Sequence, residues 1–314
     1  MTAGIAPDLD YASYFLGPSA FLTLHRSVLH SICGAATTNC ALAALFCVLD
    51  KKWPSRKPTK NQAAPLTFAP AFAVCAVGAI GHQLLDLASG EGIQLLWPFR
   101  VHWSRWNLAP AFDPWILILL VGALLIPQLF RLISEEVAGR RKGTTGSSTA
   151  LAAILILVTY FGARACLHGR AVEILLSREY HGHEPVSAGA FPSSSNPFTW
   201  RGVVSTDNTL EELNVNLSPG VDFNPDCSQT HYKPGESPAL ETGEKTDTAQ
   251  KFLKYAQFPL ASVARRENAY RFALRDLSFP AGDDSLANMI VLVDLISNPQ
   301  IIREEIRYAS SGEN

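Results

Sequence analysis

Long apolar stretches in the first half of the chain constrain its fold more than any other feature. A helix needs about 20 mostly apolar residues to cross the hydrocarbon core of a bilayer. We expect a membrane helix in each of four stretches: Ser27–Leu49, Leu66–Leu87, Trp115–Ile133 and Thr149–Leu167. No basic segment with a small-residue cleavage site precedes the first stretch, so we expect no removable signal peptide.

Composition supports a membrane protein with a soluble tail. Charged residues make up 17% of the 314 residues, against roughly 25% in an ordinary soluble domain, and most of them lie in the second half. This pattern excludes a single soluble globule, a disordered chain and a small disulfide framework. The net charge of −2 provides no basic surface for nucleic acid.

The expected fold is an α-helical integral membrane domain with about four transmembrane helices, followed by a small α+β domain with an antiparallel sheet. We place the membrane domain at residues 1–168, a helix extension and linker at 169–195, and the soluble tail at 196–314. Apolar alternation and turn residues predict the tail elements. These are strands near Thr199–Thr206, Leu210–Leu217, Ala261–Glu267, Tyr270–Phe279, Met289–Ile296 and Ile301–Tyr308, and a helix at Thr248–Phe258.

Lysine and arginine in the connections predict the orientation, because such residues are concentrated in cytoplasmic loops. The first connection carries Lys51, Lys52, Arg56, Lys57 and Lys60, the second carries Arg100 and Arg105, and the third carries Arg131, Arg140, Arg141 and Lys142. The first and third connections are therefore predicted to be cytoplasmic. The N-terminus and the tail then lie on the opposite side.

Ionisable residues gather where the first predicted span begins and the second ends. Such residues cost roughly 2.5–3.5 kcal/mol within a membrane helix, so they are candidates for function. With one hairpin between the two spans, these residues lie near the same membrane surface. The set comprises His25, Arg26, His30, His82 and Asp86, with Asp8 and Asp10 just upstream.

Imidazole and carboxylate groups together suit a divalent metal such as zinc, with manganese and iron as alternatives. The competing interpretation is structural. A single histidine on an apolar helix is more often packed and hydrogen-bonded than metal-bound, and an Asp-x-Asp pair often belongs to a turn or helix cap.

At these residues the chain resembles the YdjM-type family of membrane-bound, metal-dependent hydrolases of the bacterial inner membrane. The matching blocks are PDLD at Pro7–Asp10, HRSVLHS at His25–Ser31, GHQLLDLASGEGIQLLWPF at Gly81–Phe99 and DPW at Asp113–Trp115. The resemblance covers about residues 6–135 strongly and the fourth stretch more weakly. In the tail, the segments Asn196–Val204 and Phe252–Pro259 are similar to the C-terminal part of the family.

The resemblance implies an integral membrane hydrolase. Its metal ligands, carried over by position, are Asp8, Asp10, His25, His30, His82 and Asp86. Members of the family usually begin with a further helix that carries a Thr-His pair. Here Met1 is only six residues before Pro7, so we expect either a start upstream of Met1 or one ligand fewer.

The predicted reaction is hydrolysis of an ester or phosphoester in a lipid or lipid-linked substrate, because the site lies at headgroup depth. Asp10 is the predicted base, and Arg26 is predicted to stabilise developing negative charge. The tail is expected to cap the site. The alternative is a non-enzymatic membrane protein, either an ion or proton pathway or a structural partner with hydrogen-bonded His/Asp pairs. A folded but inactive relative is a third possibility.

Overall fold

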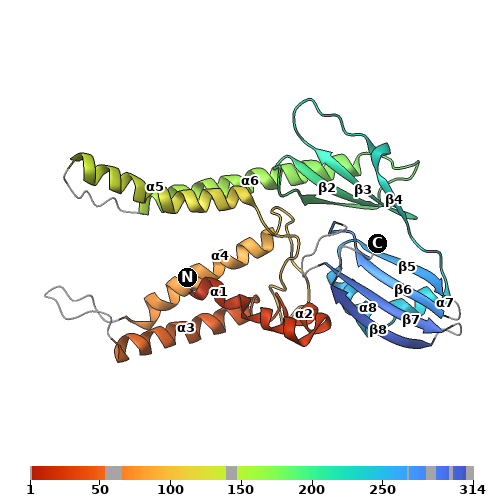
Figure 1. Ribbon diagram of the computed structural model, residues 1–314, viewed down its shortest axis with the longest axis horizontal. Coiled ribbons are helices and arrows are strands. Elements are labelled where there is room, and N and C mark those ends of the chain that lie inside the picture. Colours follow the sequence, from red (N-terminus) through yellow and green to blue (C-terminus); the bar gives the residue numbers. More distant parts are fainter. Residues whose placement is uncertain are drawn as a thin grey trace. The chain divides into compact units, whose positions relative to one another are not determined.

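The computed structural model describes residues 2–53, 66–138, 147–266, 269–280, 288–296 and 300–308 (Figure 1). The chain divides into two compact units. The first joins residues 1–106 to residues 231–314, and the second contains residues 107–230. These units are defined by contacts between residues, whereas the three segments predicted from the sequence are defined by their apolar or polar composition. The boundaries of those three segments stay a prediction.

The helical part of the first unit consists of three short helices and two long ones. They are α1 (Thr2–Ile5), the 3-10 helix η1 (Ala6–Leu16), α2 (Pro18–Leu24), α3 (Ile32–Lys52) and α4 (Phe68–Ala88). The long helices α3 and α4 lie side by side, and α1 packs on α4 (Figure 1). α1 approaches α4 closely, since a Cβ on Gly78 would be in van der Waals contact, 3.4 Å from the amide nitrogen of Gly4.

Three helices in the described part of the chain are long and apolar enough to cross a membrane. They are α3, α4 and residues Ser148–Leu176 of α6 (Ser147–Leu176). The third predicted span forms α5 (Pro114–Ala138), whose apolar portion Pro114–Leu129 is shorter. A fourth crossing therefore stays a prediction. So does the orientation, because Arg56, Lys57, Lys60, Arg140, Arg141 and Lys142 lie outside the described residues.

The first predicted span begins five residues too early. The prediction placed Ser27 within the membrane helix, but α3 starts at Ile32. The side chain of Ser31 accepts a hydrogen bond from the amide of Gly34 at 2.9 Å and so caps the helix, as serine commonly does at this position. Residues 25–31 consequently form a turn in front of α3, and His30 lies in that turn.

The rest of the first unit is an antiparallel sheet with two helices. Strands β5 (Pro259–Arg266), β6 (Ala269–Asp276), β7 (Met289–Ile296) and β8 (Ile301–Tyr308) pair in chain order. The helices α7 (Pro238–Glu244) and α8 (Asp247–Tyr255) pack on this sheet (Figure 1). Phe252 of α8 and Phe272 of β6 are fully buried in its core, which also includes Phe21 and Leu22 of α2. An N-terminal helix is thus part of the core of the C-terminal sheet.

The second unit contains α5, α6 and another antiparallel sheet. Strands β1 (Ser187–Pro192), β2 (Thr199–Ser205), β3 (Thr209–Asn216) and β4 (Gln229–Tyr232) pair in chain order, and the short 3-10 helix η2 (Pro225–Cys227) precedes β4. The end of α6 packs on this sheet through Leu175, which lies beside Trp200 in a buried cluster. A Cβ on Gly202 would come within 2.7 Å of Leu175, so the contact requires glycine there.

Most of the predicted strands are confirmed, but the single expected sheet is wrong because the described residues form two sheets. Strands β7 and β8 have the predicted bounds, while β1 lies in the stretch predicted as a linker and β4 lies where no strand is predicted. The segment of β1 reads SAGAFP, whose Ser, Gly and Pro are typical of turns. It forms a strand because β2 supplies its hydrogen-bonding partners, and Ala190 and Phe191 are buried there.

The buried ring of Phe252 tests this description of the C-terminal core. We expect Phe252→Ala to lower the free energy of unfolding by about 3–5 kcal/mol, because it removes a large side chain from a closed core. Thermal unfolding of the full chain in detergent measures the change, with Lys251→Ala on the exposed side of α8 as control. Equal midpoints for the two variants would contradict the packing described here.

Candidate metal centre

Four potential ligand atoms converge where the turn before α3 meets the end of α4. Nε2 of His30 and Nε2 of His82 are 3.2 Å apart. Oδ1 of Asp8 lies 3.7 Å from the first nitrogen and 3.4 Å from the second. Oδ2 of Asp86 lies 3.4 Å and 3.1 Å from the same two nitrogens. The residues come from η1, the turn and α4, so the site exists only in the folded chain.

These separations match the ligand spacing of a zinc site. Ligand atoms bound about 2.0–2.2 Å from a tetrahedral zinc ion lie roughly 3.3–3.6 Å from one another. Asp8, His30 and His82 can hold one metal ion by distance alone. Asp86 is not part of this three-residue group, but its Oδ2 atom faces the same two imidazole nitrogens.

The carboxylate of Asp86 contains a buried oxygen that the protein itself does not satisfy. Within the described residues, Oδ2 of Asp86 has no hydrogen-bond partner, although both imidazole nitrogens are close. A buried oxygen without a partner costs free energy. A cation bound between these atoms would remove that cost, and the donor set therefore fits a divalent metal.

Asp10 lies behind the converging atoms and holds two histidines by their other ring nitrogens. Its Oδ1 is 2.7 Å from Nδ1 of His25, and its Oδ2 is 3.0 Å from Nδ1 of His30. An ionised carboxylate only accepts hydrogen bonds, so the Nδ1 atom of His30 donates and its Nε2 atom presents a lone pair to Asp8, His82 and Asp86. Carboxylates commonly orient metal-binding histidines in this way.

The surroundings of Asp10 keep it ionised. Burial by itself would raise the pKa of this carboxyl group, but the hydrogen bonds from His25 and His30 more than offset the effect and lower the pKa to about 2. The backbone amide of Arg26 donates a third hydrogen bond to Oδ2 at 2.9 Å. Asp10 is therefore ionised, and its carboxylate holds the turn through three hydrogen bonds.

Arg26 connects the converging atoms to a neighbouring glutamate. Its guanidinium group lies 3.4 Å from Oδ1 of Asp86 and 3.3 Å from Oε2 of Glu91, and it donates a hydrogen bond to Ser89. Burial alone would lower the pKa of Arg26, but Glu91 and Asp86 raise it above its usual value. The backbone of Arg26 has a φ of 57°, a left-handed conformation that is uncommon outside glycine. The hydrogen bond to Asp10 holds this conformation in place.

The predicted site residues fall into two groups. Asp8 and Asp86 each present an oxygen to the Nε2 atoms of His30 and His82, whereas Asp10 contacts the Nδ1 atoms of His25 and His30. The ring of His25 stacks on Phe21 with 4.4 Å between centroids. Its Nε2 atom is buried and lacks a hydrogen-bond partner among the described residues. The sequence reasoning missed Glu91 and Ser89 as partners of Arg26, although both belong to the Gly81–Phe99 block.

Comparison with known proteins gives one match. Residues 1–171, more than half of the chain, match the family described as YdjM inner membrane protein. This range contains all seven candidate ligands and catalytic residues of the sequence analysis. No curated protein and no solved structure matches the chain.

Gly34 tests the structure of the turn that carries His30. A methyl group on Gly34 would lie 1.9 Å from the carbonyl oxygen of Val28, so Gly34→Ala must displace the turn. We expect a loss of about 1–3 kcal/mol in the free energy of unfolding, as for other overpacked sites. The matched control is Gly81→Ala, which has open space around its Cβ position in α4. Thermal midpoints that do not differ between these variants would refute the close contact.

Proposed function

The chain belongs to the YdjM inner membrane protein family, and from this membership and the geometry of the four converging side chains we propose that it is a metal-dependent hydrolase. The proposed cofactor is a divalent metal, with zinc as the first choice, held by Asp8, His30, His82 and Asp86. The proposed substrate is an ester or phosphoester of a lipid or lipid-linked molecule. We further propose that the protein crosses the bacterial inner membrane several times, with its tail on the non-cytoplasmic side.

The convergence of two imidazole nitrogens with two carboxylate oxygens is the observation that supports this proposal. The non-enzymatic alternative treats the same residues as hydrogen-bonded structural contacts. A proton on Nε2 of His82 would satisfy His30, which lies 3.2 Å away. The same nitrogen lies 3.1 Å from Oδ2 of Asp86, but this oxygen has no well-aligned hydrogen bond among the described residues. The cation therefore accounts for one more atom than the structural alternative does.

The residues around the metal ligands suggest separate tasks. A bound zinc ion polarises an ester or phosphoester oxygen and lowers the pKa of its water to about 7. Asp10 uses both oxygens for His25, His30 and the Arg26 amide, so we assign it a positioning role in place of the predicted role as base. Arg26 is already paired with Asp86 and Glu91. The guanidinium group of Arg26 therefore holds the Asp86 carboxylate in place and places a positive charge next to the ligand atoms.

The surroundings of the site support a substrate that resides in the membrane. His82 and Asp86 occupy the last two turns of α4, a helix able to cross a membrane. The segment η1, which carries Asp8 and Asp10, also exposes Phe15 (87% exposed) and Leu16 (72% exposed). Exposed apolar side chains next to a membrane helix suit burial at the bilayer surface. A lipid headgroup at this depth would lie beside Asp8.

Metal content provides the direct test. We expect wild-type protein purified in detergent without chelator to contain a divalent metal by elemental analysis. His82→Ala and Asp86→Ala should each lose it, because each removes one of the converging ligand atoms. His102→Ala is the control, since His102 is exposed and lies outside the converging set.

The outcome distinguishes the two hypotheses. Unchanged metal content in a His82→Ala/Asp86→Ala double variant would refute the metal site. Metal-free wild-type protein that also fails to bind added zinc would favour the structural alternative. A screen of esterase and phosphatase substrates, with chelation and zinc restoration, then tests hydrolysis. The same variants should lose activity in parallel with metal.

Asp10→Asn tests the positioning role separately. The amide keeps the shape of the side chain but removes the charge that orients His25 and His30. We expect metal affinity to fall about 10–100-fold, as for other orienting groups behind metal ligands, measured by competition with a chelating dye. Asp50→Asn at the other end of α3 is the matched control, because Asp50 accepts a hydrogen bond from the amide of Leu66 and lies away from the ligand turn. Equal affinities for the two variants would rule out the role of Asp10.

A further inference from the structure

The two oxygens of the Asp86 carboxylate face different positive or metal-binding groups. Its Oδ2 atom lies 3.4 Å from Nε2 of His30 and 3.1 Å from Nε2 of His82. Its Oδ1 atom lies 3.4 Å from Nη2 of Arg26. A carboxylate between two metal ions roughly 3.5–4 Å apart can give one oxygen to each, as in two-metal enzyme sites. Here the second oxygen of Asp86 contacts an arginine.

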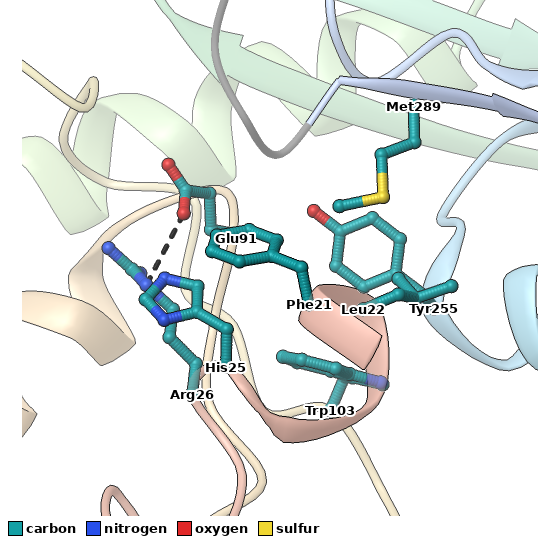
Figure 2. A pocket seen from close by; sticks show the side chains of 8 residues that line it. All are labelled: Phe21, Leu22, His25, Arg26, Glu91, Trp103, Tyr255 and Met289. Atoms are coloured by element: carbon teal, nitrogen blue, oxygen red, sulfur yellow. Dashed lines mark ion pairs between the residues drawn. The ribbon is translucent and has the colours of Figure 1, made fainter. Parts of the chain in front are cut away.

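The guanidinium group of Arg26 lies between two carboxylates. Besides its contact with Asp86, its Nε atom lies 3.3 Å from Oε2 of Glu91, and its Nη1 atom donates a hydrogen bond to Oγ of Ser89 at 3.0 Å. Figure 2 shows the ion pair with Glu91 as a dashed line. The side chain of Arg26 is only 15% exposed, so the two acids balance a charge that has lost most of its contact with water.

Backbone contacts fix the positions of Arg26 and Glu91. The amide of Arg26 donates a hydrogen bond to Oδ2 of Asp10 at 2.9 Å, and its carbonyl oxygen accepts one from the amide of Gln94 at 2.9 Å. The carbonyl oxygen of Glu91 accepts a hydrogen bond from Nε of Arg105 at 2.9 Å. These bonds do not involve the ionised groups of Arg26 and Glu91, so the two residues stay close together even without their ion pair.

We propose that the guanidinium group of Arg26 occupies the position of a second metal ion, so that the candidate centre binds one metal ion and the chain itself supplies the second positive charge. This inference rests on the proposed metal centre of the hydrolase and adds its stoichiometry. Arg26 is then a positioning residue that orients Asp86 toward the imidazoles. Because arginine stays protonated in proteins, this second charge does not depend on the supply of metal.

The other acids near the centre offer few donors to a second ion. Asp10 directs both of its oxygens at hydrogen-bond donors of the turn before α3. Within the part of the chain that the structure describes, one group of three donor side chains meets the distance requirement for a metal ion, and it consists of Asp8, His30 and His82. A single ion in that group uses both imidazoles, so a second ion would depend on the carboxylates that Arg26 already binds.

The atoms around the guanidinium group would suit a hard cation if the arginine side chain were removed. They are Oδ1 of Asp86, Oε2 of Glu91 and Oγ of Ser89. Oxygen donors of this kind favour magnesium, calcium or manganese. Without the Arg26 side chain, two carboxylates would face a space the size of a guanidinium group and would lack its positive charge. We therefore expect a variant without this side chain to gain a manganese site.

Manganese uptake by the zinc-loaded, full-length protein tests the inference. Protein in detergent is first saturated with zinc, and unbound zinc is removed. Mn²⁺ is then titrated, and the electron paramagnetic resonance signal of free Mn²⁺ measures how much is bound. Manganese does not displace the zinc, because sites with nitrogen and oxygen donors bind manganese more weakly. We expect Arg26→Gly to bind about one Mn²⁺ ion per chain more than wild type, which completes a two-metal centre.

Matched variants separate the role of the charge from other effects. Glycine suits the φ of 57° at position 26 and keeps the amide that donates to Asp10. Arg26→Lys retains the positive charge and should bind no additional manganese. Arg26→Gly/Glu91→Gln loses one of the two carboxylate charges, so its manganese uptake should return to the wild-type level. Arg26→Asn, which also tolerates a left-handed backbone, replaces Arg26→Gly if thermal unfolding shows that the glycine variant does not fold.

The two metals separate failure of the inference from failure of the proposed function. Equal manganese uptake by zinc-loaded wild type and Arg26→Gly would overturn the inference and leave the zinc centre intact. Additional uptake by Arg26→Gly that persists in Arg26→Gly/Glu91→Gln would overturn it as well. Wild type that takes up no zinc would contradict the proposed hydrolase. Manganese uptake by Arg26→Gly that requires Glu91 would, even then, support a cation position occupied by Arg26.

Discussion

The carboxylate of Asp10 is the contact on which the geometry of the candidate site depends. It accepts hydrogen bonds from His25, His30 and the backbone of Arg26, three groups within one short turn. These bonds hold a left-handed residue at position 26 and direct the free nitrogen of His30 toward Asp8, His82 and Asp86. Because the carboxylate is mostly buried and accepts three hydrogen bonds, it stays charged while losing most of its contact with water. Without this carboxylate, the rings of His25 and His30 would lose the hydrogen bonds that fix their orientation.

A second constraint links the membrane half to the C-terminal sheet. Phe21 and Leu22 of α2 are buried in the same core as Phe252 and Phe272, so the helix next to the ligand turn is anchored by residues more than 200 positions later. Arg105 and Gln257 reinforce this link through hydrogen bonds to backbone carbonyl groups on the other side. The sheet is therefore not an independent appendage. It shares a core with the helix that precedes the ligand turn.

Much of the local structure could be predicted because it depends on short-range patterns. The apolar stretches gave α3, α4 and α6, and alternation gave β7 and β8 with their observed bounds. The misplaced start of α3 has a local cause. The apolar residues Val28 and Leu29 extend the apolar stretch toward the N-terminus, whereas the helix itself begins after the Ser31 cap. Strand β1 has a non-local cause. Its Ser, Gly and Pro residues favour turns, and only pairing with β2 makes it a strand.

The sequence by itself determined which residue types are available for chemistry: two aspartates near the N-terminus, two histidines five residues apart, and a histidine and an aspartate one helical turn apart near the end of the second apolar stretch. It also determined that these segments belong to a membrane protein, because long apolar helices follow them. Only the tertiary structure decided how the residues divide, with Asp8 and Asp86 beside the two imidazoles and Asp10 behind them. Residue type and spacing do not specify which oxygen of a carboxylate faces which nitrogen. That choice depends on the packing of η1, the turn and α4 against one another.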